Sequence, residues 1–283
     1  MAASHTREVG RHDIPGSART LSRLPSSSTQ RRMANLGLQD IYDWLGGEYW
    51  RCNTGWLDPG SDVREWSGLT ITTAGDLVSI NLINNGLEGE MPESLCNLYC
   101  LQHLNLSYNF KLRGWIPEGL GDLINLKTLH LYSALLAGAI PESLGQLSNL
   151  EELFLHCNLL TGEIPASLGN LKCLRKLFLN SNDIIGSIPP ELGRLSSLDT
   201  LNLSWNNLHG EVPPSVRALE NLQLLSIEGN EQLVLSRDAV YGGRGGFATG
   251  GSSTAWEAAE EAMELHTATH LGDEGEPSPA PLG

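Results

Sequence analysis

The sequence predicts an α/β solenoid, a fold in which short repeats stack into one continuous coil. A 24-residue unit recurs almost seven times between Leu77 and Leu233. In each unit a Leu-x-x-Leu-x-Leu segment has the period of two that is typical of a short strand. A turn and a proline follow, which suit a return along the opposite side. Because this self-similarity has a period of 20 to 50 residues, it indicates stacked repeats that share one interior.

The clearest copy of the unit, residues 150–173, justifies each element in order. Its leucines point inward from the strand, and Asn158 then turns the chain because an Asn side chain bonds nearby backbone groups. Gly162 permits a tight path, and Pro165 suits the first position of a helical turn. The second copy carries one extra residue near Phe110. The copies begin at Leu77, Leu101, Leu126, Leu150, Leu174, Leu198 and Leu222.

The turn asparagine is present in every copy except the third, where Ala134 replaces it. We therefore expect a weak point there, with backbone groups left to water or to neighbours. An asparagine introduced at position 134 should raise the melting temperature.

The repeats, residues 77–233, are preceded by a predicted capping module, residues 33–76, that holds four of the seven tryptophans. Terminal repeats of a solenoid need a cap, so we expect these rings to seal the open end; an aromatic binding patch is the alternative. Helical periodicity over 33–45 places Leu38, Ile41, Trp44 and Leu45 on one face.

The two ends differ from the repeats in composition. Residues 1–32 are rich in arginine and serine, which indicates a disordered or transit-like tail without the apolar segment of a secretory signal. Residues 234–283 are predicted to form a glycine-rich linker and an acidic tail, with a possible short helix over 254–266 opened by a capping box. We expect a cytoplasmic location; import into an organelle, or secretion from a longer start, are the alternatives.

Charge and hydropathy exclude several classes of partner. The formal net charge is −15, and the arginines are concentrated in residues 1–33, so the repeats are strongly acidic. Nucleic acid and anionic membranes both need a basic footprint, so we expect a neutral or basic protein or peptide partner. No run of 18 apolar residues indicates a membrane span. No cofactor motif is present, and the five scattered cysteines favour a reducing compartment.

The candidate partner-binding site lies on the outward residues of the central strands. Neighbouring strands lie about 4.8 Å apart, so residues at matching positions of the third, fourth and fifth repeats should be close together. Exposed aromatic rings there would act as interface anchors, and Glu152 and Lys176 could fix the orientation of a ligand. The predicted partner-binding residues are His130, Tyr132, Glu152, Phe154, His156, Lys176, Phe178 and Trp205.

Other interpretations of these residues stay open. Phe154 and Phe178 could stack on each other and merely stabilise neighbouring strands. His130 and His156 could serve a metal or an enzyme, but zinc needs a third ligand, and acid–base chemistry needs a pocket that an open sheet does not offer. N-glycosylation sequons at Asn105 and Asn202 fall on this same face, and we interpret both as chance matches to the sequon pattern.

The Leu-x-Gly-x-Ile-Pro segments, as in residues 85–95, 134–145, 158–169 and 182–193, resemble the plant-type leucine-rich-repeat family. The segment 44–82 is similar to the tryptophan-rich cap that precedes such repeats. The resemblance implies a right-handed superhelix with a concave parallel β-sheet that binds proteins or peptides, as in receptor-like proteins and polygalacturonase-inhibitor-like proteins. This chain departs from them because its caps lack their paired cysteines, with Cys52 alone at the N-terminal end, and because its sequence shows neither a membrane span nor kinase motifs.

The sequence therefore favours a non-catalytic interaction scaffold with no cofactor and no metal site. The first alternative is a secreted or membrane-associated receptor-like protein in signalling or defence. The second is an enzyme or metal binder that uses His130 and His156.

Overall fold

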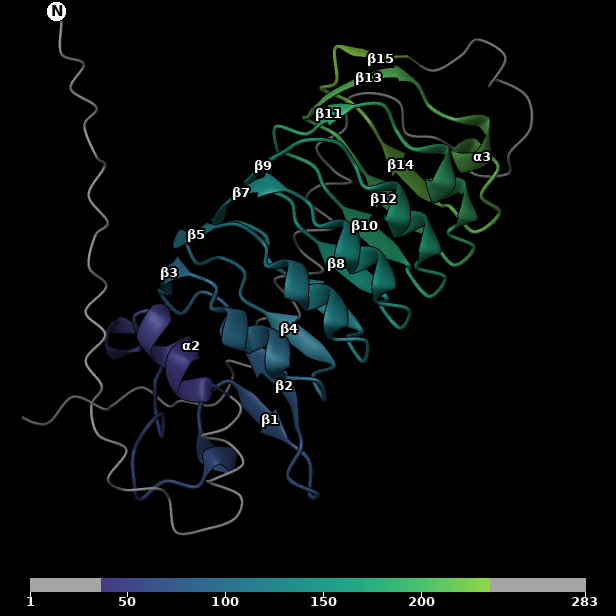
Figure 1. Ribbon diagram of the computed structural model, residues 1–283. Helices are drawn as coiled ribbons and strands as arrows, with labels where there is room; N and C mark the ends of the chain where they lie inside the picture. Colours follow the sequence, from purple (N-terminus) through teal and green to yellow (C-terminus); the bar gives the residue numbers. More distant parts are fainter. Residues whose placement is uncertain (1–36, 235–283) are drawn as a thin grey trace, which may run out of the picture.

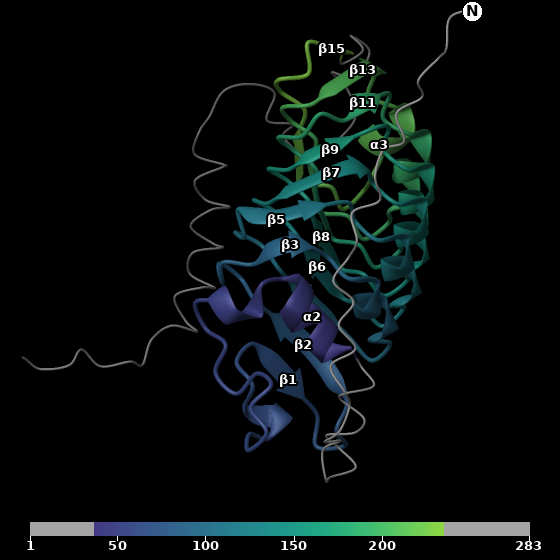
Figure 2. The ribbon, with the colours of Figure 1, turned by 60° about the vertical axis from the view of Figure 1, so that its left-hand side comes forward.

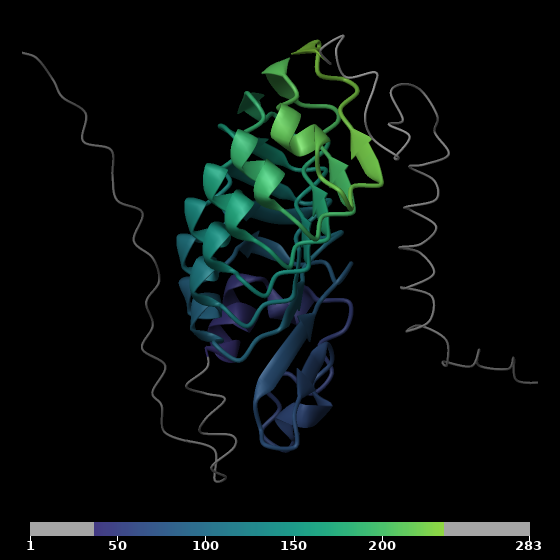
Figure 3. The same ribbon diagram turned by 90° about the vertical axis from the view of Figure 1, so that its right-hand side faces the viewer.

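The computed structural model describes residues 37–234, which form one curved coil of stacked repeats (Figure 1). Each of the seven repeats contributes a strand to a long sheet, and each of the first six also contributes a short helix to the opposite side of the coil (Figure 3). The predicted α/β solenoid is confirmed. The predictions for residues 1–32 and for a helix over 254–266 lie outside the described residues.

The long sheet follows the order of the chain, because each repeat places its strand beside that of the preceding repeat. The first pair is antiparallel and every later pair is parallel. Matching positions of neighbouring repeats stand opposite each other, as the sequence predicts: His130 pairs with Phe154, and Phe154 with Phe178. The strands are β1 (Leu69–Ile71), β2 (Leu77–Asn81), β4 (His103–Asn105), β6 (Thr128–His130), β8 (Glu152–Phe154), β10 (Lys176–Phe178), β12 (Thr200–Asn202) and β14 (Leu224–Ser226).

Short helices form the convex side, and in five of the repeats a 3-10 helix starts just after the Ile-Pro or Met-Pro step. The proline lacks an N–H group and has a fixed φ, so it suits this position. The helices of the repeats are η3 (Glu93–Asn97), η4 (Glu118–Asp122), η5 (Glu142–Gln146), η6 (Ala166–Asn170), η7 (Pro190–Arg194) and α3 (Pro214–Arg217). The cap that precedes them contains α2 (Leu38–Trp44), η1 (Gly47–Tyr49) and η2 (Val63–Glu65).

A second set of strands runs along one edge of the coil, which the sequence did not lead us to expect (Figure 2). These strands pair in parallel through the Leu-x-Gly segments, where Gly162 has a φ of 77°. Two short sheets result, joined by a single bridge between Glu163 and Ile185. They are β3 (Glu88–Glu90), β5 (Lys111–Gly114), β7 (Leu135–Ala139) and β9 (Leu159–Thr161), then β11 (Ile185–Gly186), β13 (Asn207–Glu211) and β15 (Gln232–Val234).

One hydrophobic core runs through the whole coil, from Leu38 in the cap to Leu225 in β14, the last strand of the long sheet. The repeat leucines are fully buried, as Leu129, Leu153 and Leu177 illustrate. Apolar burial is the main favourable contribution to folding, and here neighbouring repeats share it. The repeats therefore stabilise one another.

Turn asparagines form a hydrogen-bonded ladder along the coil. The Nδ2 of Asn158 donates to the carbonyl oxygens of Leu131, Leu155 and His156, at 2.8, 3.0 and 3.3 Å. Its Oδ1 accepts from the amide of Leu136 at 3.1 Å. The same pattern recurs at Asn182, Asn206 and Asn230. Each side chain thus satisfies buried backbone groups of two repeats.

Ala134 interrupts this ladder, as the sequence predicts. In the ladder pattern an asparagine at this position would accept from the amide of Leu112. That amide instead donates to the carbonyl oxygen of Asn109, at 3.0 Å. The extra residue near Phe110 lies between these two groups, so the local turn replaces the missing side chain. The expected gain in stability from Ala134→Asn stays a prediction.

The cap seals the open end of the first repeat with aromatic rings. Trp50 and Trp56 are buried edge to face, with ring centroids 4.9 Å apart, and Trp66 packs beside them. The indole of Trp50 donates to the carbonyl oxygen of Leu45 at 2.7 Å. The expectation for Trp44 is wrong: its side chain is 55% exposed, while Leu38, Ile41 and Leu45 are buried. Helix α2 buries a narrower apolar stripe than its periodicity indicated.

Candidate functional site

The predicted site residues gather on the face of the long sheet that lies opposite the short helices. Strands β6, β8 and β10 contain five of the eight predicted residues, and the other three follow a strand: Tyr132 follows β6, His156 follows β8 and Trp205 follows β12. The rings of His130 and Phe154 stack with centroids 4.3 Å apart, and those of Tyr132 and His156 stack at 4.4 Å. Phe154 meets Phe178 edge to face at 4.8 Å. We call Tyr132, Phe154, His156 and Phe178 the aromatic floor.

The aromatic floor is buried, so the prediction of exposed interface anchors is wrong for these four residues. Tyr132 is 4% exposed, Phe154 6%, His156 2% and Phe178 8%. Parallel strands bring matching side chains to within about 5 Å, so each ring shields the next from water. The alternative interpretation, in which Phe154 and Phe178 pack on each other across neighbouring strands, is confirmed.

A charged row lies beside the floor, formed by three side chains of neighbouring strands. His130 Nε2 lies 3.1 Å from one carboxylate oxygen of Glu152, and Lys176 Nζ donates to the other at 3.0 Å. The hydrogen bond with His130, followed by Lys176, lowers the pKa of Glu152 to about 2 despite its partial burial. The carboxylate is therefore ionised at neutral pH, and it links the outer faces of three strands.

His156 behaves as a neutral ring of the floor. Burial, with a smaller contribution from nearby His130, lowers its pKa to about 3. Burial likewise raises the pKa of the Tyr132 hydroxyl. Neither group titrates near neutral pH, so neither is suited to acid–base chemistry there. In the described part of the chain, no three His, Cys, Asp or Glu side chains are grouped as metal ligands.

Trp205 does not join the floor. It lies at the rim, where the chain turns from β12 towards β13, and its side chain is 64% exposed. Tyr108 lies at the matching position of the second repeat and packs on Tyr132 at 5.1 Å. The sequence interpretation missed Phe110, which contacts Tyr108 at 6.2 Å and is 64% exposed. The extra residue of the second repeat was the signal that could have found it.

The two sequons differ in accessibility. Asn202 is 8% exposed, and its Oδ1 accepts from both the amide and the hydroxyl of Ser204, at 3.1 and 2.7 Å. Asn105 is partly exposed, and its Oδ1 accepts from the amide of Ser107. The amide of Asn202 is therefore poorly placed to carry a glycan on the folded chain.

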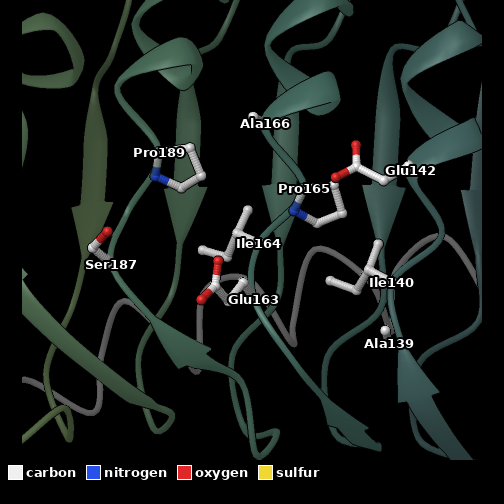
Figure 4. A pocket seen from close by; sticks show the side chains of 9 residues that line it. All are labelled: Ala139, Ile140, Glu142, Glu163, Ile164, Pro165, Ala166, Ser187 and Pro189. Carbon is white, nitrogen blue, oxygen red and sulfur yellow. The ribbon is translucent and has the colours of Figure 1, made fainter.

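An open hollow of about 410 Å³ lies between the edge sheets and the convex helices (Figure 4). Two of its lining residues are small at positions where the preceding repeat has a larger side chain: Ala139 corresponds to Trp115, and Ala166 corresponds to Glu142. Ile140 and Ile164 form part of its lining. This hollow contains none of the predicted site residues.

Comparisons with known proteins identify the repeats. Leucine-rich-repeat family profiles match residues 76–98, 100–123, 124–184 and 197–219. In the solved complex of BIR3 and SERK2 from Arabidopsis thaliana, a chain 34% identical to this one matches over 95% of its length and 63% of ours, with a TM-score of 0.54. The chain belongs to the leucine-rich-repeat family.

Other similar proteins include receptor-like kinases and an ice-binding protein. A probably inactive receptor-like protein kinase of Arabidopsis thaliana is 40% identical over 79 residues, 27% of this chain and 9% of the relative. The receptor kinase HAESA, solved with the peptide hormone IDA and the co-receptor SERK1, has a TM-score of 0.63 and 30% identity over 69% of this chain and 33% of its own. A plant ice-binding protein has a TM-score of 0.64 and 27% identity over 71% of this chain and 72% of its own.

The chain thus spans less than a tenth of the curated relative and a third of HAESA. A receptor kinase and an ice-binding protein are both similar in fold to this chain, so the fold alone does not determine the ligand, which depends on the side chains that each chain displays. Within residues 37–234 every helix is too short or too polar to cross a membrane.

Proposed function

We propose that this chain is a non-catalytic recognition module that binds a peptide or an extended protein segment on the concave face, over the central repeats. The observation that carries the proposal is the construction of that face. A rigid aromatic floor holds the charged row His130–Glu152–Lys176 in place, while Lys176 and the rim side chains stay accessible to a ligand.

The similarity to HAESA, a structure that contains a peptide hormone, supports a peptide ligand. The strong negative charge of the repeats favours a neutral or basic partner. Receptor-like recognition, with this module as part of a longer protein, is the second candidate, and the similarity to receptor-like kinases favours it. A cytoplasmic location stays a prediction, and subcellular fractionation of the cells that produce the protein tests it.

The concave-face proposal can be tested with a displayed library of random 12-residue peptides, selected on the immobilised full chain. Selected peptides are then measured against Ser181→Arg. Ser181 stands on the rim at the position matching Tyr108, whose ring packs against Tyr132 of the floor. An arginine side chain at position 181 should therefore lie against the central repeats and obstruct a ligand there. We expect its dissociation constants to rise about tenfold or more.

Gln146→Arg is the matched control, because it adds the same charge on the exposed convex side, in η5. Its dissociation constants should stay within about twofold of wild type, since it lies away from the ligand. Peptides that bind Ser181→Arg as tightly as wild type would contradict the proposal.

A further inference from the structure

The rim of the concave face carries one residue per repeat with a left-handed backbone. We call these residues the rim row. Their φ values lie between 49° and 58° in six successive repeats, and a glycine with φ 73° follows in the seventh. The members are Asn84, Tyr108, Ser133, Cys157, Ser181, Trp205 and Gly229.

Two members of the rim row have unusually large side chains for residues with a left-handed backbone. A left-handed backbone suits glycine or asparagine, and bulky residues there are outliers. Serine fills this position at Ser133 and Ser181, so the turn does not require an aromatic ring. Tyr108 and Trp205 nevertheless occupy it, at the two ends of the central repeats. Residues kept in an unfavourable backbone conformation tend to cluster at functional sites.

Both rings are positioned by their neighbours. Tyr108 packs against Tyr132 and against Phe110, the exposed aromatic residue next to the extra position of the second repeat. Trp205 leans over the last repeat: a Cβ atom built on Gly229 would lie 2.7 Å from the indole ring, so only glycine leaves room for it. Tyr108 and Trp205, which we call the two posts, therefore stand on either side of three rim residues with smaller side chains, Ser133, Cys157 and Ser181.

The post at Trp205 also has an acidic neighbour. The amide of Trp205 donates to the carbonyl oxygen of Glu228 at 2.7 Å, so the two residues are adjacent across neighbouring repeats. The Glu228 side chain is exposed, and no basic side chain within residues 37–234 forms an ion pair with it. The exposed Trp205 indole and the exposed Glu228 side chain therefore start from neighbouring backbone positions, and an indole face and a carboxylate are the groups that attract an arginine or lysine side chain.

The posts are four strand steps apart, or about 19 Å at about 4.8 Å per step. An extended peptide that crosses the strands rises about 3.3 Å per residue, so about six residues span this distance. Residues i and i+6 point to the same side of an extended chain, because side chains alternate with a period of two. A single peptide can therefore reach both posts at once.

We propose that the two posts select an extended peptide with a large apolar side chain at one anchor and an arginine or lysine six residues away at the other. The apolar side chain contacts Tyr108 and Phe110, and the basic side chain lies between Trp205 and Glu228. This inference rests on the proposed function and specifies its ligand.

The test uses the same 12-residue peptide library, selected in parallel on the full chain and on rim variants. Wild type should enrich peptides in which a large apolar residue and a basic residue are six positions apart. Trp205→Ser and Glu228→Gln should each lose the preference for the basic residue while keeping the apolar one. The double variant Tyr108→Ser, Phe110→Ser should lose the preference for the apolar residue while keeping the basic one. Serine is the residue that Ser133 and Ser181 already show to fit this backbone.

Trp115→Ser controls for nonspecific binding of peptides to any exposed indole ring. Trp115 is 62% exposed, but it follows β5 in the edge sheet and lies outside the proposed site. It should select the wild-type motif. Enriched peptides without the spaced pair, or an unchanged motif on Trp205→Ser, would overturn the inference. If Ser181→Arg still weakens those peptides, the concave-face proposal survives alone; if it does not, both fail.

Discussion

At the scale of single residues, the surroundings of each side chain in the site determine its charge. Glu152 is ionised because His130 and Lys176 hold its two oxygens, whereas His156 is neutral because burial disfavours its charge. The sequence placed all these residues on one face correctly. It could not show that Phe154 and Phe178 are buried, because ring-to-ring shielding between strands depends on three-dimensional packing.

The lowered pKa of Glu152 predicts a specific loss of stability in acid. Its folded pKa, about 2, lies below the ordinary value of 4.5, so its contribution is complete above about pH 4.5 and is lost as the pH falls towards 2. Unfolding free energies should therefore fall between pH 5 and pH 2 by about 1–3 kcal/mol more in wild type than in Glu152→Gln. Parallel curves for the two proteins would contradict the assignment.

Removal of a floor ring should destabilise the chain and not only its binding. Phe154→Ala deletes a buried ring that packs against Phe178 and His130, and we expect a loss of about 2–4 kcal/mol in unfolding free energy by denaturant titration. Phe110→Ala, which removes an exposed ring, is the control and should stay within about 0.5 kcal/mol of wild type. Equal effects of the two variants would mean that the floor is not a packed unit.

At the scale of elements, the repeat pattern predicted the long sheet, because apolar alternation directly marks which side of a strand is buried. The edge strands were missed for a physical reason: they arise from backbone pairing around Leu-x-Gly, without such alternation. Trp44 was misplaced because the short α2 buries only Leu38 and Ile41, together with Leu45 just after its end. Periodicity alone does not give the width of a buried stripe.

The asparagine ladder offers a test at this scale. Asn158→Ala removes the hydrogen bonds of a buried amide to backbone groups of two repeats, so it should cost about 2–3 kcal/mol of unfolding free energy. Ala134→Asn should raise the melting temperature, with a gain of about 1 kcal/mol or less, because the Leu112 amide already has a partner. A lower melting temperature for Ala134→Asn would show that the local turn does not accommodate the asparagine side chain.

At the scale of the whole molecule, the coil is a rigid frame that displays a row of side chains on its inner face. Strand spacing is fixed, so the distance between two rim residues is set by the number of repeats between them. The family resemblance correctly predicted the solenoid fold and the parallel β-sheet on its inner face. The spacing of Tyr108 and Trp205 could be counted from the sequence, but their shared backbone conformation and exposure came only from the structure.

Amide hydrogen exchange of the full chain, with and without a library-selected 12-residue peptide, tests the central claim most directly. We predict that the bound peptide slows exchange in the rim row and in the backbone after β6, β8, β10 and β12, and leaves η3 to η7 unchanged. Protection confined to the convex helices or to the edge sheets, with the rim row unaffected, would contradict the account.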